Sequence, residues 1–103
     1  MLKIAEVYEK QVRESKESPD GSVYTDFHKV FDTRDCLLNI DYIVNVLPYE
    51  FEASIDKDRI EESFPSNTKF SKIVVDGNSF RKSELIVVGS FDKFCRILEG
   101  NKT

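Results

Sequence analysis

The sequence predicts an α+β fold: an antiparallel sheet of about five strands with a C-terminal helix packed on one face. Two short apolar runs, Ile73–Val75 and Leu85–Val88, are rich in β-branched residues and too short for ordinary helices. The turn signal Asp76-Gly77-Asn78 stands between them, because Gly and Asn tolerate the positive φ of tight turns. The apolar residues that follow have the spacing of one helical face: Phe91, Phe94, Cys95 and Leu98.

The expected closing helix has its own start and stop signals. The Ser90 hydroxyl can cap its first turn, and Asp92 adds a negative charge where the helix dipole favours one. Gly100 is expected to end the helix.

The first part of the chain is expected to add a strand and a hairpin. Residues 2–10 fit a strand or a helix by their apolar spacing, which by itself slightly favours a helix. The resemblance described below favours a strand, and we expect a strand. Pro19-Asp20-Gly21 marks a turn within the loop of residues 15–22. Residues 23–31 alternate as a half-buried strand, and the polar run Asp32–Asp35 is expected to turn.

The clearest alternation in the chain runs from Cys36 to Val46, with a bend expected at Asn39-Ile40-Asp41. Pro48 restricts this strand to an edge or an end of the sheet, because proline lacks the N–H that a central strand donates.

Residues 1–103 are expected to form a single domain with a polar excursion at residues 54–69. The segment Asp56–Glu62 can form a helical turn, which Phe64-Pro65 would break. Long polar loops in small domains are more often functional or disordered than inert, so we expect this one to be partly mobile.

The charge pattern excludes a general nucleic-acid binder. The chain has 33% charged residues and a net charge of −4, whereas a binder of nucleic-acid polymers needs a basic surplus. The acidic surplus lies in residues 1–66, and residues 67–103 are basic. A local basic patch is therefore expected around Lys69, Lys72, Arg81 and Lys82.

The two cysteines, Cys36 and Cys95, show no metal-binding or redox spacing, so we interpret them as small buried hydrophobes. No apolar run approaches the length that spans a bilayer, and no signal peptide is evident. We expect a protein that does not contact membranes and that resides in the cytoplasm with reduced thiols.

No catalytic set is visible. His28 is the only histidine, and a nucleophile–histidine pair or a metal centre needs further groups close to it. The phosphate-binding glycine motifs are missing, and the acidic run at residues 56–62 lacks the central glycine of a calcium loop. We therefore expect a protein that is not an enzyme and that holds neither a cofactor nor a metal.

Arginines are the best candidates for ligand binding, because a guanidinium grips phosphate with a planar fork. Arg81 follows Phe80 and the turn residue Asn78, and this group can form a platform for a nucleobase and its phosphates. Arg34, in its expected turn, and Arg96, on the last helix, complete the candidate set. The alternative is that Phe80 lies in the core and Arg81 guards a strand edge.

Four segments carry a family resemblance: Ile4–Lys10, Leu38–Val44, Phe70–Val75 and Leu85–Ser90. Their order resembles a group of small phage-encoded proteins, and within it the chain is most similar to the Thoeris anti-defence sponge proteins. Its second half alone resembles the flagellar FlbD family. The sponge resemblance implies non-catalytic sequestration of a cyclic nucleotide-type signal of the cyclic ADP-ribose class. It also implies a homo-oligomer in the host cytoplasm.

A second hypothesis is a small protein-interaction module, such as an inhibitor of a host protein. The acidic first half and the excursion at residues 54–69 would then form the contact.

Overall fold

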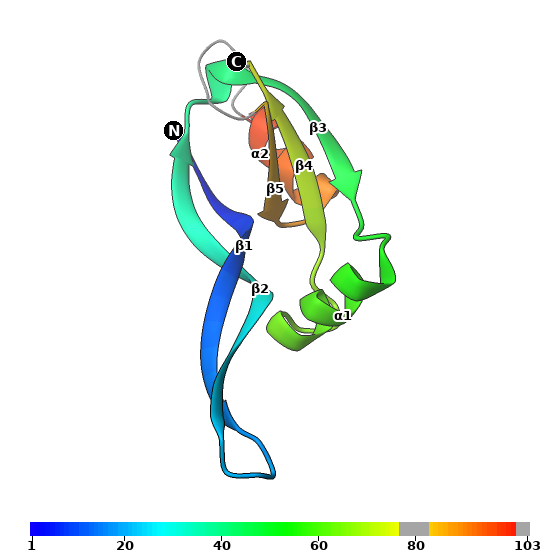
Figure 1. Ribbon diagram of the computed structural model, residues 1–103. Coiled ribbons are helices and arrows are strands. Elements are labelled where there is room, and N and C mark those ends of the chain that lie inside the picture. Colours follow the sequence, from blue (N-terminus) through cyan, green and yellow to red (C-terminus); the bar gives the residue numbers. More distant parts are fainter. Residues whose placement is uncertain (77–82, 101–103) are drawn as a thin grey trace.

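The computed structural model describes residues 1–76 and 83–100, which fold as an α+β protein (Figure 1). Its five strands form one sheet in the order β2-β1-β5-β4-β3, and every neighbouring pair is antiparallel. The predicted fold class is thus confirmed. In chain order the elements are β1 (Leu2–Glu17), β2 (Val23–Leu38), the 3-10 turn η1 (Ile40–Tyr42), β3 (Ile43–Tyr49), α1 (Ser54–Ser63), β4 (Phe70–Val75), β5 (Glu84–Val88) and α2 (Phe91–Gly100).

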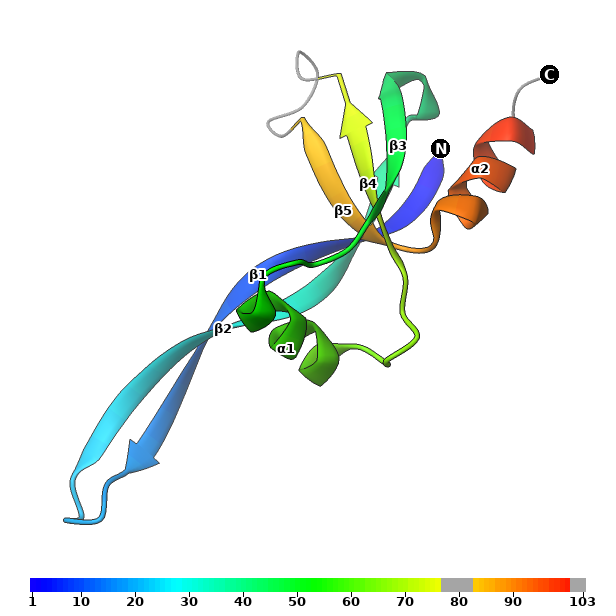
Figure 2. The same cartoon turned by 90° about the vertical axis from the view of Figure 1, so that its right-hand side faces the viewer.

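The strands β1 and β2 form a long hairpin whose outer half projects from the body as an arm (Figure 2). The predicted turn at Pro19-Asp20-Gly21 closes it, with Gly21 at φ +88°. The Asp20 carboxylate accepts hydrogen bonds from the Ser22 amide at 3.0 Å, from the Ser22 hydroxyl at 2.6 Å and from the Ser18 hydroxyl. Pairing continues without a shift from Glu17 opposite Val23 to Leu2 opposite Leu38.

The predicted turn at Asp32–Asp35 is wrong, because this segment lies inside β2. Each of its charged residues faces an opposite charge on β1: Asp32 with Lys10 at 3.9 Å, Arg34 with Glu6 at 2.9 Å and Asp35 with Lys3 at 3.7 Å. Cross-strand pairs of opposite charge make such a polar run compatible with a strand. Arg34 therefore lies in a strand and not in a turn.

The bend expected near Asn39 is confirmed. The Asn39 side-chain oxygen accepts a hydrogen bond from the Asp41 amide at 3.0 Å, and η1 separates β2 from β3. β3 lies at one edge of the sheet, where Pro48 is tolerated as predicted.

The excursion at residues 54–69 contains α1, a helix of ten residues, which is longer than the predicted turn. It ends where expected, with the Phe64 amide donating to the Ile60 carbonyl at 2.8 Å. Gly77 and Asn78, the centre of the predicted turn after β4, lie outside the described residues.

Two apolar clusters lie on opposite faces of the sheet, because alternate residues of β4 and β5 point to opposite sides. The first contains Ile73, Val87 and the 2% exposed Phe94 of α2, which lies behind β4 and β5 in Figure 1. The second contains Phe31 and Phe70, and Ile60 of α1 packs against it. Each helix thus covers its own cluster.

The cysteines differ from their predicted burial. Cys36 and Cys95 are free thiols, and both are half-buried rather than buried. Cys36 packs against the first cluster.

Candidate functional site

An open groove of about 430 Å³ lies where the end of β3, α1, the segment before β4 and the start of α2 meet. Ligand pockets commonly have volumes of about 300–1,000 Å³, and the volume of the groove falls within this range. Its main lining residues are Tyr49, Glu50, Phe51, Lys57, Glu61, Ser66, Thr68, Lys69, Phe70, Ser90 and Phe91.

Packed aromatic rings form the floor of the groove. The Phe51 ring lies 5.2 Å from the Phe31 ring, 5.0 Å from the Tyr49 ring and 5.2 Å from the Phe70 ring, measured between centroids. Phe64 continues the stack at 5.3 Å from Phe70. Tilted and edge-to-face rings at these separations attract one another beyond their area of burial. Tyr49, Phe51 and Phe70 thus give the groove an apolar floor, and their contacts with Phe31 and Phe64 join it to the second cluster.

Cations and hydroxyls surround this floor. Lys57 comes from α1 and Lys69 from the residue before β4, and both side chains are exposed. Among the described residues, no carboxylate lies within ion-pair distance of either ammonium. Glu50 and Glu61 also line the groove, so its formal charge is balanced.

The start of α2 is held firmly at the groove. The Gly89 amide donates to the Lys69 carbonyl at 2.8 Å, and the Ser71 hydroxyl donates to the Gly89 carbonyl at 2.8 Å. The Ser90 hydroxyl accepts from the Lys93 amide at 3.1 Å, which confirms the predicted cap. The partial positive charge of the helix N-terminus thus adds to that of the two lysines.

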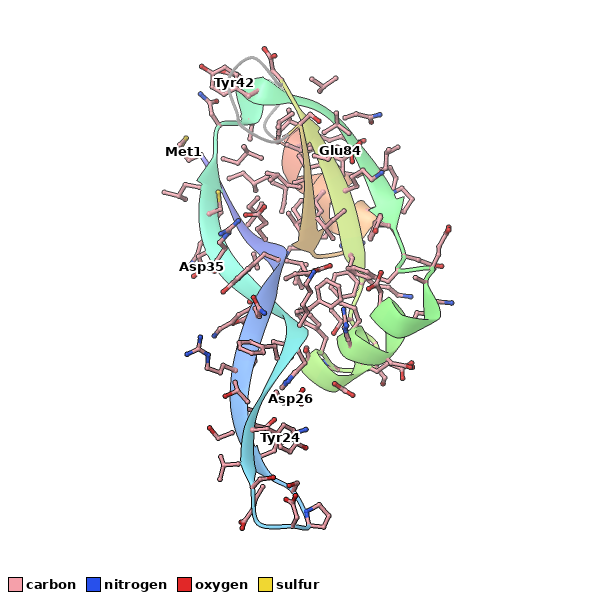
Figure 3. The ribbon with its side chains drawn as sticks, viewed as in Figure 1. Met1, Tyr24, Asp26, Asp35, Tyr42 and Glu84 are labelled. Carbon is pink, nitrogen blue, oxygen red and sulfur yellow. The ribbon has the colours of Figure 1, made fainter. Side chains whose placement is uncertain are left out.

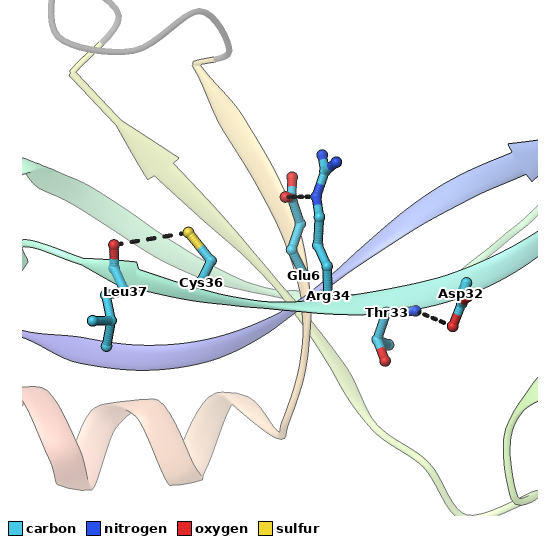
Figure 4. Close-up of polar contacts among 6 residues, drawn as sticks. All are labelled: Glu6, Asp32, Thr33, Arg34, Cys36 and Leu37. Carbon is cyan, nitrogen blue, oxygen red and sulfur yellow. Dashed lines mark hydrogen bonds and ion pairs between the residues drawn. The ribbon is translucent and has the colours of Figure 1, made fainter.

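The predicted ligand residue Arg34 lies elsewhere, on β2, and is bound within the hairpin (Figure 4). Its Nε donates to the Glu6 carboxylate at 2.9 Å, and its guanidinium lies 4.8 Å from the Tyr8 ring centroid. Glu6 is 6% exposed. The hydrogen bond that Arg34 donates to Glu6, together with the negative charge of Glu6, raises the pKa of Arg34. The main role of Arg34 in this structure is therefore to neutralise the buried carboxylate of Glu6.

Of the other predicted ligand residues, only Arg96 lies in the described part of the chain. Arg96 is exposed on α2 and does not line the groove. Asn78, Phe80 and Arg81 lie outside the described residues, so their predicted role stays a prediction.

One polar cluster on the arm was missed because the sequence separates its members. The ligand atoms of Glu14, Asp26 and His28 lie within 4.8 Å of one another, since the hairpin register places residue 14 opposite residue 26. Figure 3 shows Asp26 on the arm. Lys16 binds the Asp26 carboxylate at 2.8 Å, which lowers the pKa of Asp26 and raises that of Lys16. A cation here would have to displace the Lys16 ammonium, so the cluster is better explained as an ion pair.

Sequence reasoning also missed the groove residues Tyr49, Phe51 and Lys57. It expected Lys69 in a local basic patch, but not beside an aromatic surface. One sequence signal could have located the groove: Tyr49 and Phe51 stand just before the polar excursion at residues 54–69, which ends at Lys69. The pairing of those segments with the start of α2 is visible only in three dimensions.

No helix in residues 1–76 or 83–100 is long and apolar enough to cross a membrane. Comparison with known proteins gives no match to a family model, to a curated protein or to a solved structure.

Proposed function

We propose that this protein is a non-catalytic binding protein that sequesters a small anionic ligand of the cyclic nucleotide type, such as one of the cyclic ADP-ribose class. The observation that carries the proposal is the groove, which joins an aromatic floor to Lys57, Lys69 and the N-terminus of α2. Aromatic faces stack on nucleobases, and ammoniums and helix N-termini bind phosphates.

The chemistry of the lining favours binding over turnover. The groove presents rings, hydroxyls, ammoniums and carboxylates, but its lining includes neither a thiol nor an imidazole. His28, the only histidine of the chain, lies on the arm. Nucleophilic catalysis by cysteine or serine usually relies on an imidazole base beside the nucleophile.

Thermal shift and calorimetry against a panel of cyclic nucleotides test the proposal. A ligand that binds only the folded chain raises its melting temperature. Lys69→Ala and Lys57→Ala should each weaken binding roughly ten- to a hundredfold, the range for losing a charged hydrogen bond. Lys3→Ala is the matched control, because Lys3 is exposed and does not line the groove.

The ligand should be recovered chemically intact after heat release. A converted ligand, or the absence of a thermal shift with every cyclic nucleotide tested, would reject sequestration. Equal affinity in the groove variants and the control would show that the ligand binds outside the groove. Residues 78–81 would then be the next candidate site.

A protein-interaction module is the second candidate function, and the arm favours it. Val23, Tyr24 and Phe27 are 73%, 50% and 53% exposed there, and large apolar residues gathered on a projecting surface mark contacts with other proteins. This function predicts that a specific protein partner binds the full chain but not a chain with a shortened arm.

A further inference from the structure

β2 is an outer strand of the sheet and runs over sixteen residues. A long outer strand leaves a row of backbone groups available for pairing with another chain. Two of the most exposed apolar residues in the described part of the protein, Val23 at 73% and Leu37 at 63%, lie near the two ends of this strand.

The chain also exposes more surface than a compact monomer of its size. Its accessible area is 7535 Å², whereas 11.9 kDa predicts roughly 6,000 Å². Its radius of gyration is 17.5 Å, against about 13 Å for a compact chain of this length.

We propose that the partner of this strand is a second copy of the chain. The two β2 strands pair antiparallel around a two-fold axis at Val30, and the two sheets become one sheet of ten strands. This assembly does not depend on the proposed ligand.

Backbone geometry limits the register of such a pair. In a regular strand, the N–H and C=O groups of alternate residues point to the same edge, so residues that face each other across the axis must have the same parity. With Val30 opposite itself, every residue faces one of its own parity. The overlap then runs from Val23 opposite the partner's Leu37 to Leu37 opposite the partner's Val23.

Charge and apolar complementarity select this register among those that geometry allows. Asp26 faces the partner's Arg34, His28 faces the partner's Asp32, and the exposed Val23 and Leu37 cover each other. A shift by two residues in one direction puts Asp26 opposite Asp32 and Lys29 opposite itself. The opposite shift puts Asp26 opposite the partner's Cys36, so Asp26 loses its pairing with the partner's Arg34. Juxtaposed like charges are the usual means by which interfaces reject wrong arrangements.

The selected register also extends the charge pairs already present within each hairpin. Lys16 binds Asp26 at 2.8 Å, and Arg34 binds Glu6 through its Nε at 2.9 Å. Figure 4 shows the terminal nitrogens of Arg34 pointing away from Glu6. Across the junction, ion pairs then link four strands: Lys16 with Asp26, Asp26 with the partner's Arg34, and the partner's Arg34 with the partner's Glu6. Lys16 reaches Asp26 diagonally, because Glu14 lies directly opposite Asp26 on β1.

Mass measurement by light scattering or sedimentation over a range of concentrations tests the proposal. We expect twice the 11.9 kDa chain mass. Asp26→Lys places a lysine opposite the partner's Arg34 and should raise the dissociation constant roughly tenfold or more. Glu14→Lys makes the same charge change on the same arm, but on β1 away from the outer edge, and should leave the dimer intact.

A cysteine cross-link tests the register directly in a Cys36→Ser, Cys95→Ser background. Val30→Cys should form a disulfide-linked dimer under mild oxidation, because opposed residues have Cα atoms within the range of a disulfide. Lys29→Cys should not, since its own copy lies diagonally opposite at about 7–8 Å. A monomer at every concentration overturns the proposal. So does a dimer that Asp26→Lys leaves unchanged or that Val30→Cys fails to trap.

Discussion

At the scale of single residues, Gly89 shows most clearly how one position directs the chain. It has φ +135°, and a Cβ placed there would lie 2.8 Å from Cε2 of Phe94. Gly89 therefore allows the sharp change of direction from β5 to α2. Because it has no Cβ, it also leaves room for the buried Phe94 ring of α2. The sequence suggested the cap at Ser90 and the burial of Phe94, but not this dependence on the glycine before them.

Gly89→Ala should be much more harmful than Gly21→Ala. Both positions have positive φ, but a Cβ at Gly21 would meet no atom within 4 Å. Gly21→Ala should cost about 1 kcal/mol of backbone strain, whereas Gly89→Ala adds overpacking against Phe94 and should cost about 3 kcal/mol or more. Urea unfolding of the two variants gives the comparison. Equal losses would show that Phe94 moves aside freely.

Asp20 makes the hairpin turn sensitive to acid. Hydrogen bonds from the Ser18 and Ser22 hydroxyls, and then from the Ser22 amide, hold its pKa well below the ordinary value of 3.8. A group with a lowered folded-state pKa contributes stability above its unfolded pKa, and that contribution is lost as the pH falls through the folded value. The turn should therefore be fully supported at neutral pH and should loosen below about pH 4.

A titration of the Asp20 carboxyl by NMR, together with amide exchange at Ser22, measures this effect. Asp20→Asn is the control, because its turn should not change over the same pH range. An Asp20 that titrates at its ordinary value would contradict the hydrogen-bonded turn.

At the scale of elements, α1 should be the least protected regular element of the body. Its N-cap residue, Ala53, makes no side-chain capping bond, and its apolar anchors to the second cluster are Ile60 and the residue after the helix, Phe64. β4 is paired on both sides and contains the fully buried Ile73. Amide exchange should be fast at residues 56–62 and slow at residues 73–75. Similar protection in both would mean that α1 is covered by a partner.

The strands that sequence reasoning located best are those buried by their own apolar pattern. β4 and β5 were found because their apolar runs have few polar interruptions. β2 was divided wrongly at Asp32–Asp35, because a strand stabilised by opposite charges on its neighbour resembles a turn when it is read alone. For the same reason β1 extends to Glu17, beyond the predicted Lys10.

The candidate groove was less predictable than the fold. Local rules locate elements, but the groove joins the end of β3, α1, the segment before β4 and the start of α2. Only the sheet order, which places β4 beside β3, brings those segments together. Arg34 was misjudged because its ion pair with Glu6 spans 28 positions in the sequence.

At the scale of the whole molecule, the protein consists of a packed body and an arm that contributes nothing to the cores. The two clusters draw on β1 and β2 only as far as Val7 and Phe31, and no residue from 8 to 30 is buried. The molecule extends over 67 Å in its longest dimension. A two-stranded ribbon is marginally stable by itself in water, so the arm needs either its ion pairs or a second chain.

Shortening the arm should therefore leave the body folded. Lys10 and Val30 are directly opposed, so replacing residues 11–29 with Asn-Gly closes the hairpin with a two-residue turn. The free energy of unfolding should change by less than about 1 kcal/mol, because the deletion removes only partly or fully exposed side chains and shortens a loop. Urea unfolding measures this, with Asp26→Lys as the reference, at a protein concentration where light scattering shows both chains to be monomers. If the shortened chain lost its cooperative transition, the arm would be part of the folding unit and the division into body and arm would be wrong.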